Sequence, residues 1–497
     1  MREGERPGEG SVHREGRPEV CDPPGPADRR WDKALRRRHL YLFAAVLVVY
    51  LATPVRNDSD SYYAYATAAS IVHRHTLDVG TFDFPADPRL IRANDRRLNF
   101  FAWTTALTAI PAVAALDIAH LAGVGPGGDG AASRPGLVNA IEKAVGSMTA
   151  ALAAVVLAVA AERLVGNAKR RGAVGIGVGL LFALTTSAWS EASRTMDEHG
   201  PSMLCLAAAF YCALAIATAA DGHEPDPGRS ALGLGAWLAA SYVMRPTNAV
   251  LVATLGCWVL WRHRARLLSL IVGGLAVAVP WLAVTRSQYG TWLPPYFSGD
   301  RLRLHSAFLE ALAGNLVSPS RGLLVYSPAI VALAVAGGVL AVRRQAVGES
   351  SRSLMLLLGA AVLVHWVAIS AFPHWWGGYS YGPRFFTDLG VPLAILATPA
   401  VERLFDLRWS EGSVTGRVSI VTSAVLLVWS AFVHGEGAMF ADSSCWNSRP
   451  DVDSHPDRLW DWSDPQFLAG VRAAPNLTPR SFVLGHCAAQ AAPEDHR

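Results

Sequence analysis

The feature that most constrains this chain is a series of apolar stretches separated by polar connections, with arginines gathered at alternate ends of the stretches. The stretches comprise residues 40–55, 144–164, 173–189, 201–219, 232–243, 249–261, 267–284, 323–342, 354–372, 389–404 and 418–433. A helix that crosses a bilayer needs roughly 20 mostly apolar residues. With 51% hydrophobic and 17% charged residues, the chain is too apolar for an ordinary soluble protein of 497 residues. The sequence therefore predicts an all-α, polytopic membrane bundle with one transmembrane helix for each of these 11 stretches.

The arginines predict how the bundle is oriented. Residues 36–38 are three arginines that precede the first apolar stretch, and positive charge favours the cytoplasmic side. Residues 1–38, rich in Gly, Pro, Glu and Arg, are predicted to form a disordered basic cytoplasmic tail. The membrane domain then covers residues 39–434, and residues 435–497 form a small extracytoplasmic tail. The net charge of +4 is small, so we expect no nucleic-acid partner, and the Arg, Ala and Gly bias predicts a bacterial plasma membrane.

One apolar stretch has two interpretations. Residues 101–121 are apolar but contain Pro111 and Asp117. If they crossed the membrane, the basic residues 169–171 would fall outside, so the positive-inside rule favours an interfacial or re-entrant piece. The pairing of Cys445 with Cys487 in an oxidising compartment is likewise left open.

The first extracytoplasmic loop, residues 57–100, is polar and rich in aspartates. Loops of this length usually carry function, and helical spacing within residues 62–72 predicts an amphipathic helix along the membrane face. Asp58 and Asp60 match the Asp-x-Asp pattern with which soluble nucleotide-sugar transferases hold a metal, but no alternating strand and helix domain flanks them. A carboxylate here could instead serve as a general base on an acceptor hydroxyl.

Further charged groups fall at the same outward ends of the predicted spans. These are Asp197, Glu198, His199 and Arg321, together with the residues from His374 to Arg384. An ionisable group costs roughly 2.5–3.5 kcal/mol at the centre of a membrane helix, and less toward the surface, so such groups tend to serve a task. The alternative is that each is a solvated helix end. Arg245, before a proline, needs a partner that is either a phosphate or a carboxylate within the bundle.

The residues from His374 to Phe386 read His-Trp-Trp-Gly-Gly-Tyr-Ser-Tyr-Gly-Pro-Arg-Phe-Phe. Aromatic side chains offer flat faces to a sugar or a lipid, and glycines allow tight turns. The alternative is an interfacial loop, because Trp and Tyr commonly line membrane surfaces. We interpret the stretch as half of a site, lined by His199, His374, Trp375, Trp376, Tyr379 and Tyr381.

Several motifs of the chain together resemble the GT-C membrane glycosyltransferases, the family of protein O-mannosyltransferases and the lipid A aminoarabinose transferase. The motifs, which also resemble a largely uncharacterised bacterial group of GT-C-like proteins, are Asp60-Ser-Tyr-Tyr, Glu198-His-Gly-Pro, Arg245-Pro-Thr-Asn, residues 315–328 and residues 375–386. The resemblance implies a helical bundle with juxtamembrane helices in the first loop and a polyprenyl-phosphate sugar as donor.

By position, the resemblance implies roles for particular residues. The catalytic base would be Asp60, with Asp58 as the alternate, and the second acid would be Asp197 or Glu198. The lipid phosphate would be bound by Arg384, together with Arg321 or Arg245. No metal site or cofactor is predicted, and the need for a divalent cation is left open.

The sequence leaves three functions in competition. The first is a glycosyltransferase that moves a hexosyl or pentosyl group from a polyprenyl-phosphate donor to a cell-wall glycan, lipid or protein outside the cytoplasm. The second is a transporter or flippase of a lipid-linked saccharide, which should place charges along a path through the membrane. The third is a non-catalytic scaffold of the same fold.

Overall fold

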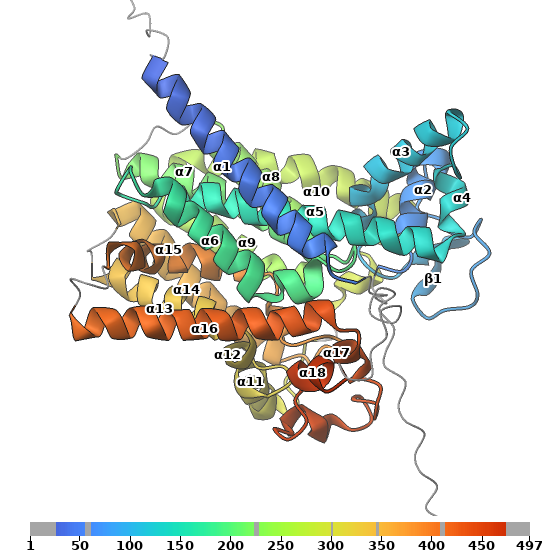
Figure 1. Cartoon of the computed structure of the whole chain (residues 1–497). Helices are drawn as coiled ribbons and strands as arrows, with labels where there is room; N and C mark the ends of the chain where they lie inside the picture. The colour runs from blue at the N-terminus through green and yellow to red at the C-terminus, as the bar shows by residue number, and fades with distance from the viewer. Residues whose placement is uncertain are drawn as a thin grey trace, which may run out of the picture.

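The computed structural model describes residues 26–54, 61–222, 228–299, 302–343, 347–407 and 413–473, with side chains from Arg37 onward. The regular secondary structure of the described chain is almost entirely helical (Figure 1). The predicted N-terminal tail up to residue 25 lies outside the described residues, as do the two candidates for the base, Asp58 and Asp60.

Each predicted apolar stretch contains a helix. These are α1 (Pro26–Leu51), α5 (Pro135–Glu162), α6 (Arg171–Thr185), α7 (His199–Ala220), α8 (Ser230–Met244), α9 (Ala249–Arg262), α10 (Leu267–Tyr289), α13 (Pro328–Val342), α14 (Glu349–Ser370), α15 (Gly390–Asp406) and α16 (Val414–Met439). By length and composition, 6 segments of the described chain could cross a membrane, and one of them is Trp103–Leu121. The helical membrane character is thus confirmed, whereas the full number of crossings stays a prediction.

Small residues bring the longest helices into close contact. Helices α8 and α10 approach so closely at Gly235 and Gly273 that a Cβ atom on either glycine would collide with the backbone of the facing helix. Helices α13 and α15 approach equally closely at Gly337, where a Cβ atom would collide with the carbonyl oxygen of Leu396. Such contacts are the usual means of packing helices in a membrane, where the lipid is as apolar as the side chains.

The first loop and the residues that follow it up to α5 fold into short elements beside the beginning of α5 (Figure 1). They are α2 (Ala64–Arg74), β1 (Leu90–Ala93), β2 (Arg96–Asn99), η1 (Trp103–Ala109), α3 (Ile110–Leu121) and α4 (Gly128–Ala132). The helix predicted within residues 62–72 is present as α2. The hairpin of β1 and β2 was not predicted; its turn residues Asn94 and Asp95 have φ values of 47° and 58°. These two residue types tolerate the left-handed region that such turns need.

Short segments complete the same end of the bundle. They are η3 (Pro246–Asn248), η5 (Pro295–Phe297), α11 (Phe308–Val317), α12 (Leu323–Tyr326), η7 (Arg384–Phe386), α17 (Asp442–Cys445), η8 (Pro456–Trp460), η9 (Gln466–Leu468) and α18 (Ala469–Ala473). At the opposite end, η4 (Arg264–Arg266) joins α9 to α10. Residues 440–473, called the C-terminal segment below, follow α16 and pack near its end (Figure 1). Cys445 is disulfide-bonded, and its predicted partner Cys487 lies outside the described residues.

Candidate functional site

The connection between α6 and α7 concentrates buried charges at the end of the bundle that carries the first loop. It contains η2 (Ala188–Ala192), a π-helical turn that carries Glu191. Arg194, Asp197 and Glu198 follow, and each of these four side chains is at most 1% exposed. Burying a charge is unfavourable unless it is paired and hydrogen-bonded, and π-helical turns frequently occur at functional sites. The connection is therefore the first component of a candidate site.

Glu191 and Arg194 tie this connection to distant segments. The Glu191 carboxylate accepts a hydrogen bond from the backbone N–H of Tyr381 at 2.5 Å. The Arg194 guanidinium donates to the carbonyl oxygens of Gly437 at 2.5 Å and Pro54 at 3.2 Å. The end of α1, the end of α16 and the aromatic loop are thus held around one connection.

A buried cluster of polar groups joins α7, α8 and the beginning of α15. Asp388 Oδ2 lies 2.9 Å from Arg245 Nε and 3.1 Å from His199 Nδ1, and Ser202 donates a hydrogen bond of 2.6 Å to Asp388 Oδ1. Arg245 Nη1 also lies 2.8 Å from His199 Nε2. Of the two partners proposed for Arg245, a phosphate or a carboxylate, the structure supplies the carboxylate of Asp388.

Arg384 lies one turn before Asp388 in the loop that precedes α15. Three glycines with positive φ shape this loop: Gly377 at 70°, Gly378 at 64° and Gly382 at 61°. Any other residue would be strained there, because Cβ disfavours the left-handed region. Arg384 begins η7 and is partly exposed, whereas Arg245 and Arg321 are buried. Of the three predicted phosphate-binding arginines, Arg384 is therefore the most accessible.

Arg321 makes a full set of contacts with the protein. A guanidinium has five N–H donors. The acceptors are the carbonyl oxygens of Ser320, Trp376 and Gly378 and the side-chain oxygens of Asn447 and Gln466, at 2.5–3.1 Å. All five donors are thus committed to the aromatic loop, to the neighbouring backbone and to the C-terminal segment. This geometry gives Arg321 a structural role and leaves it no donor for the phosphate that the sequence assigned to it.

The predicted substrate-lining side chains of the loop also contact the protein. His374 Nε2 and Trp376 Nε1 each lie 2.8 Å from Asp453 Oδ1 in the C-terminal segment. Trp375 is only 2% exposed and packs in an apolar cluster with Ala311, Trp446, Val452 and Leu459. These three side chains hold the loop against the C-terminal segment, and His199 lies in the buried cluster with Asp388.

The two tyrosines of the loop make separate contacts. Tyr381 is buried and donates to the carbonyl oxygen of Val433 at 2.6 Å. Tyr379 is half exposed and donates to Asp451. Hydrogen bonds from Ser454 and then from Tyr379 lower the pKa of the Asp451 carboxyl to about 2, because they stabilise its charged form.

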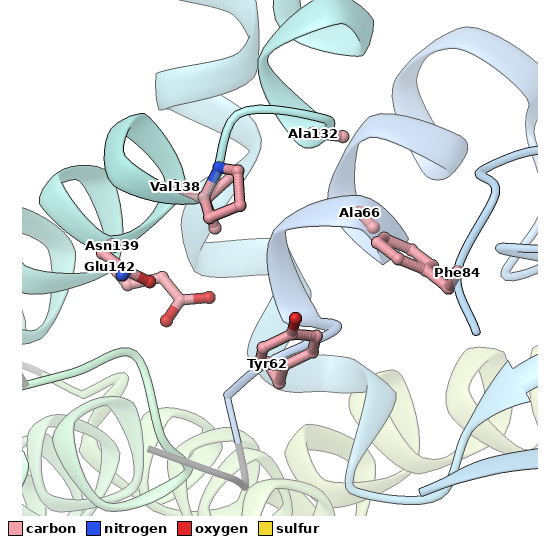
Figure 2. A pocket seen from close by; sticks show the side chains of 8 residues that line it. Tyr62, Ala66, Phe84, Ala132, Val138, Asn139 and Glu142 are labelled. Atoms are coloured by element: carbon pink, nitrogen blue, oxygen red, sulfur yellow. The ribbon is translucent and has the colours of Figure 1, made fainter. Parts of the chain in front are cut away.

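The first loop meets the same connection through Ser61. Ser61 Oγ donates to Glu142 Oε2 at 2.7 Å and lies 2.6 Å from Thr195 Oγ1. Beside it is a small cavity of about 40 Å³, into which Glu142 and Tyr62 point (Figure 2). Pro54 and Ser61, the described residues on either side of the stretch with Asp58 and Asp60, thus bond to Arg194 and Thr195.

The structure therefore brings together some of the predicted site residues. Asp197, Glu198 and His199 share one end of the bundle with Arg245 and the loop that carries Arg384. Sequence reasoning missed several buried charges around them, among which are Glu142, Glu191, Arg194 and Asp388. A signal for Asp388 and Glu191 was present, since each is an isolated acid beside an apolar stretch. In the described part of the chain, no group of three or more His, Cys, Asp or Glu side chains could hold a metal ion.

Comparison with known proteins finds similarity only in structure. No protein-family model matches the chain, and no curated protein matches it by sequence. The oligosaccharyltransferase of Archaeoglobus fulgidus in the apo form is 11% identical with a TM-score of 0.43, over 86% of this chain and 60% of that chain. The same values hold for archaeal AglB in complex with an inhibitory peptide and a dolichol-phosphate. ArnT from Cupriavidus metallidurans bound to undecaprenyl phosphate is 14% identical with a TM-score of 0.43, over 93% of this chain and 86% of that chain.

The solved structures found are thus an archaeal oligosaccharyltransferase and ArnT, to which this chain is 11–14% identical. This chain spans less than two thirds of the length of the archaeal oligosaccharyltransferase. A TM-score of 0.43 is too low to assign a chemistry to this chain by similarity, so the proposed function rests on the residues of this chain.

Proposed function

We propose that this chain is a membrane glycosyltransferase that moves a sugar from a polyprenyl-phosphate donor to an acceptor hydroxyl on the extracytoplasmic side. The observation that carries the proposal is the convergence of two segments on the connection between α6 and α7, which carries Asp197 and Glu198. These segments are the residues on either side of the stretch with Asp58 and Asp60, and the loop with Arg384. A partly exposed guanidinium suits the phosphate of a lipid-linked donor, and a carboxylate near it suits the removal of a proton from the acceptor.

Arg384 is the proposed ligand of the donor phosphate. A guanidinium binds a phosphate with two parallel charge-assisted hydrogen bonds, which are roughly twice as strong as neutral ones. Its position at the start of η7, before α15, supports this role, because the phosphate of a lipid-linked sugar lies at the membrane surface, where such helices begin. Asp388 and Arg245 support it from within the bundle by fixing the beginning of α15 against α7 and α8.

Asp60 is the proposed general base, with Asp58 as the alternative. Asp60 directly precedes Ser61 in the chain. The Ser61 hydroxyl contacts Thr195, which lies two residues before Asp197. In the proposed reaction the carboxylate takes the proton of the acceptor hydroxyl, whose oxygen forms a bond to C1 of the sugar from the face opposite the phosphate. The bond between C1 and the phosphate oxygen breaks, and polyprenyl phosphate leaves with both electrons of that bond. Arg384 stabilises the charge that develops on the leaving phosphate.

The test is a transfer assay with the purified full chain, in detergent, and radiolabelled polyprenyl-phosphate sugars, with membrane extracts as the source of acceptor. The proposal predicts movement of label from the lipid phase to acceptor or to water. A flippase carries out no bond cleavage, so it would leave the label on the lipid in detergent. The same outcome is expected of a non-catalytic scaffold, and it would overturn the proposal.

One substitution and its matched control test whether Arg384 binds the donor. Arg384→Ala should weaken donor binding about 10- to 100-fold, which corresponds to the 1.5–3 kcal/mol of a hydrogen bond to a charged group. Arg92→Ala, which removes an exposed arginine of β1 at the same end of the molecule, is the matched control and should leave donor binding unchanged. If both variants bind the donor as the wild type does, Arg384 is not its ligand.

A further inference from the structure

A large groove lies at the opposite end of the bundle from the candidate site, between α13, α15 and α16. It has a volume of about 730 Å³ and is lined mainly by aliphatic side chains such as Leu340 and Leu404. Its wall on α16 belongs to a helix of which only 22% of the membrane-spanning window is buried. The groove is therefore expected to face the acyl chains of the membrane lipids.

Two arginines stand at the end of the groove. Arg343 follows α13 and Arg403 lies in the last turn of α15, and both side chains are exposed. The acids near them have other partners, because Asp406 pairs with Arg170 and Glu402 accepts a hydrogen bond from a backbone N–H. Within the described ranges, neither of the two guanidiniums has an ion pair or a side-chain hydrogen bond. Basic pockets between membrane helices attract anionic lipid head groups.

Hydroxyl groups line the α16 side of the same groove. Thr415, Ser419, Thr422 and Ser423 recur at the spacing of one helix face. Ser419 donates back to the carbonyl oxygen of Thr415 at 2.9 Å. In the part of the chain that the structure describes, the hydroxyl of Thr415, at the level of the arginines, has no such partner. A polar group in hydrocarbon needs an acceptor, and the ester carbonyls of a glycerophospholipid provide one, whereas a polyprenyl chain does not.

The length of the groove matches one leaflet. From Thr415 to Leu426, both of which line it, α16 rises about 16 Å at 1.5 Å per residue. Half of the roughly 30 Å hydrocarbon core is about 15 Å. The arginines therefore lie at head-group level when acyl chains occupy the apolar part.

We infer that this groove binds an anionic glycerophospholipid, with its phosphate between Arg343 and Arg403 and its ester groups against Thr415 and Ser419, in the first turns of α16. The acyl chains cover the apolar faces of α13 and α15. The positive-inside rule assigns this lipid to the cytoplasmic leaflet. The site is separate from the proposed transfer site and does not depend on the proposed function.

The test is native mass spectrometry of the full chain in detergent, titrated with phosphatidylglycerol or with zwitterionic phosphatidylcholine. The wild type should bind phosphatidylglycerol more tightly. The double variant Arg343→Ala/Arg403→Ala should lose about 30-fold in affinity, from about 1 kcal/mol for each basic side chain. Arg264→Ala/Arg266→Ala removes two arginines from η4 at the same end of the bundle and should keep the wild-type affinity. Equal affinity for the two lipids, or no effect of the first double variant, would overturn the inference.

A second pair of measurements identifies the lipid class. Thr415→Val/Ser419→Ala should lower the affinity for phosphatidylglycerol and leave any binding of undecaprenyl phosphate unchanged, because only the former has ester carbonyls. Tighter binding of undecaprenyl phosphate, with displacement of phosphatidylglycerol from the wild type, would show that the groove serves a polyprenyl lipid and would refute the assignment. Both variants change exposed or groove-lining side chains, so retained monodispersity is the check on folding.

Discussion

Replacement of Arg321 by lysine separates a structural role from phosphate binding. Lysine keeps the charge but has three N–H donors in place of five, so at least two of the five acceptors around Arg321 lose their partner. An orphaned buried acceptor costs about 1–3 kcal/mol. Arg321→Lys should therefore lower the free energy of opening of the C-terminal segment by about 2–6 kcal/mol. At the lower bound this raises its opening equilibrium roughly 30-fold.

Amide hydrogen exchange of η9 and α18 measures this opening directly. The matched control is Arg303→Lys, the same substitution at an exposed arginine, which should leave exchange unchanged. The structure predicts faster exchange in the Arg321 variant with donor affinity retained once the segment is closed. Unchanged exchange together with weakened donor binding would refute the structural role and restore Arg321 as a phosphate ligand.

Three further predictions concern stability. Asp388→Asn breaks a buried ion pair and should lower the free energy of unfolding by about 3–5 kcal/mol, measured by thermal unfolding. Asp406→Asn, at a partly exposed pair, should lower it by at most about 1 kcal/mol. Equal losses in the two variants would contradict the burial of the cluster around Asp388. Gly382→Ala should lower Tm, because the φ of 61° at this position disfavours a Cβ atom. Gly338→Ala, at a position in α13 with open space around it, should not lower Tm. Equal Tm values for the two variants would contradict the strain assigned to position 382. The pKa of Asp451 is lowered from its ordinary 3.8 to about 2, so its stabilisation is present above about pH 4 and lost as pH falls through 2. Exchange of the C-terminal segment between pH 5 and 2 should show this loss, and Asp451→Asn should remove that acid-dependent part.

The helices were predictable from the sequence because each long apolar run has to satisfy its backbone groups internally in a membrane. A helix beginning near residue 201 and the loop before α15 were also expected, because charges and glycines interrupt the apolar pattern there, and α7 begins at His199. The number of crossings was not fixed, since helices such as α6 and α13 have only 15 residues each. Length alone does not decide whether so short a helix spans a bilayer.

The candidate site was only partly predictable. The sequence placed Arg384 and the acids Asp197 and Glu198 at one membrane surface, and the structure brings their segments together. It could not show that Arg321 is saturated by five acceptors, because those acceptors come from three separate segments. It likewise could not pair Arg245 with Asp388, since a contact between residues 143 positions apart leaves no periodic signal.

We propose that Asp60 and Arg384 act on one lipid-linked donor, Asp60 as the general base and Arg384 as the ligand of the phosphate. The most direct test is single-turnover transfer from a radiolabelled polyprenyl-phosphate sugar, measured with donor affinity in the same preparation. Asp60→Asn should bind the donor as the wild type does and transfer at least about 100-fold more slowly, the contribution expected of a general base. Asp83→Asn, at an exposed aspartate of the same loop, should retain both properties. Wild-type transfer by Asp60→Asn would contradict the account.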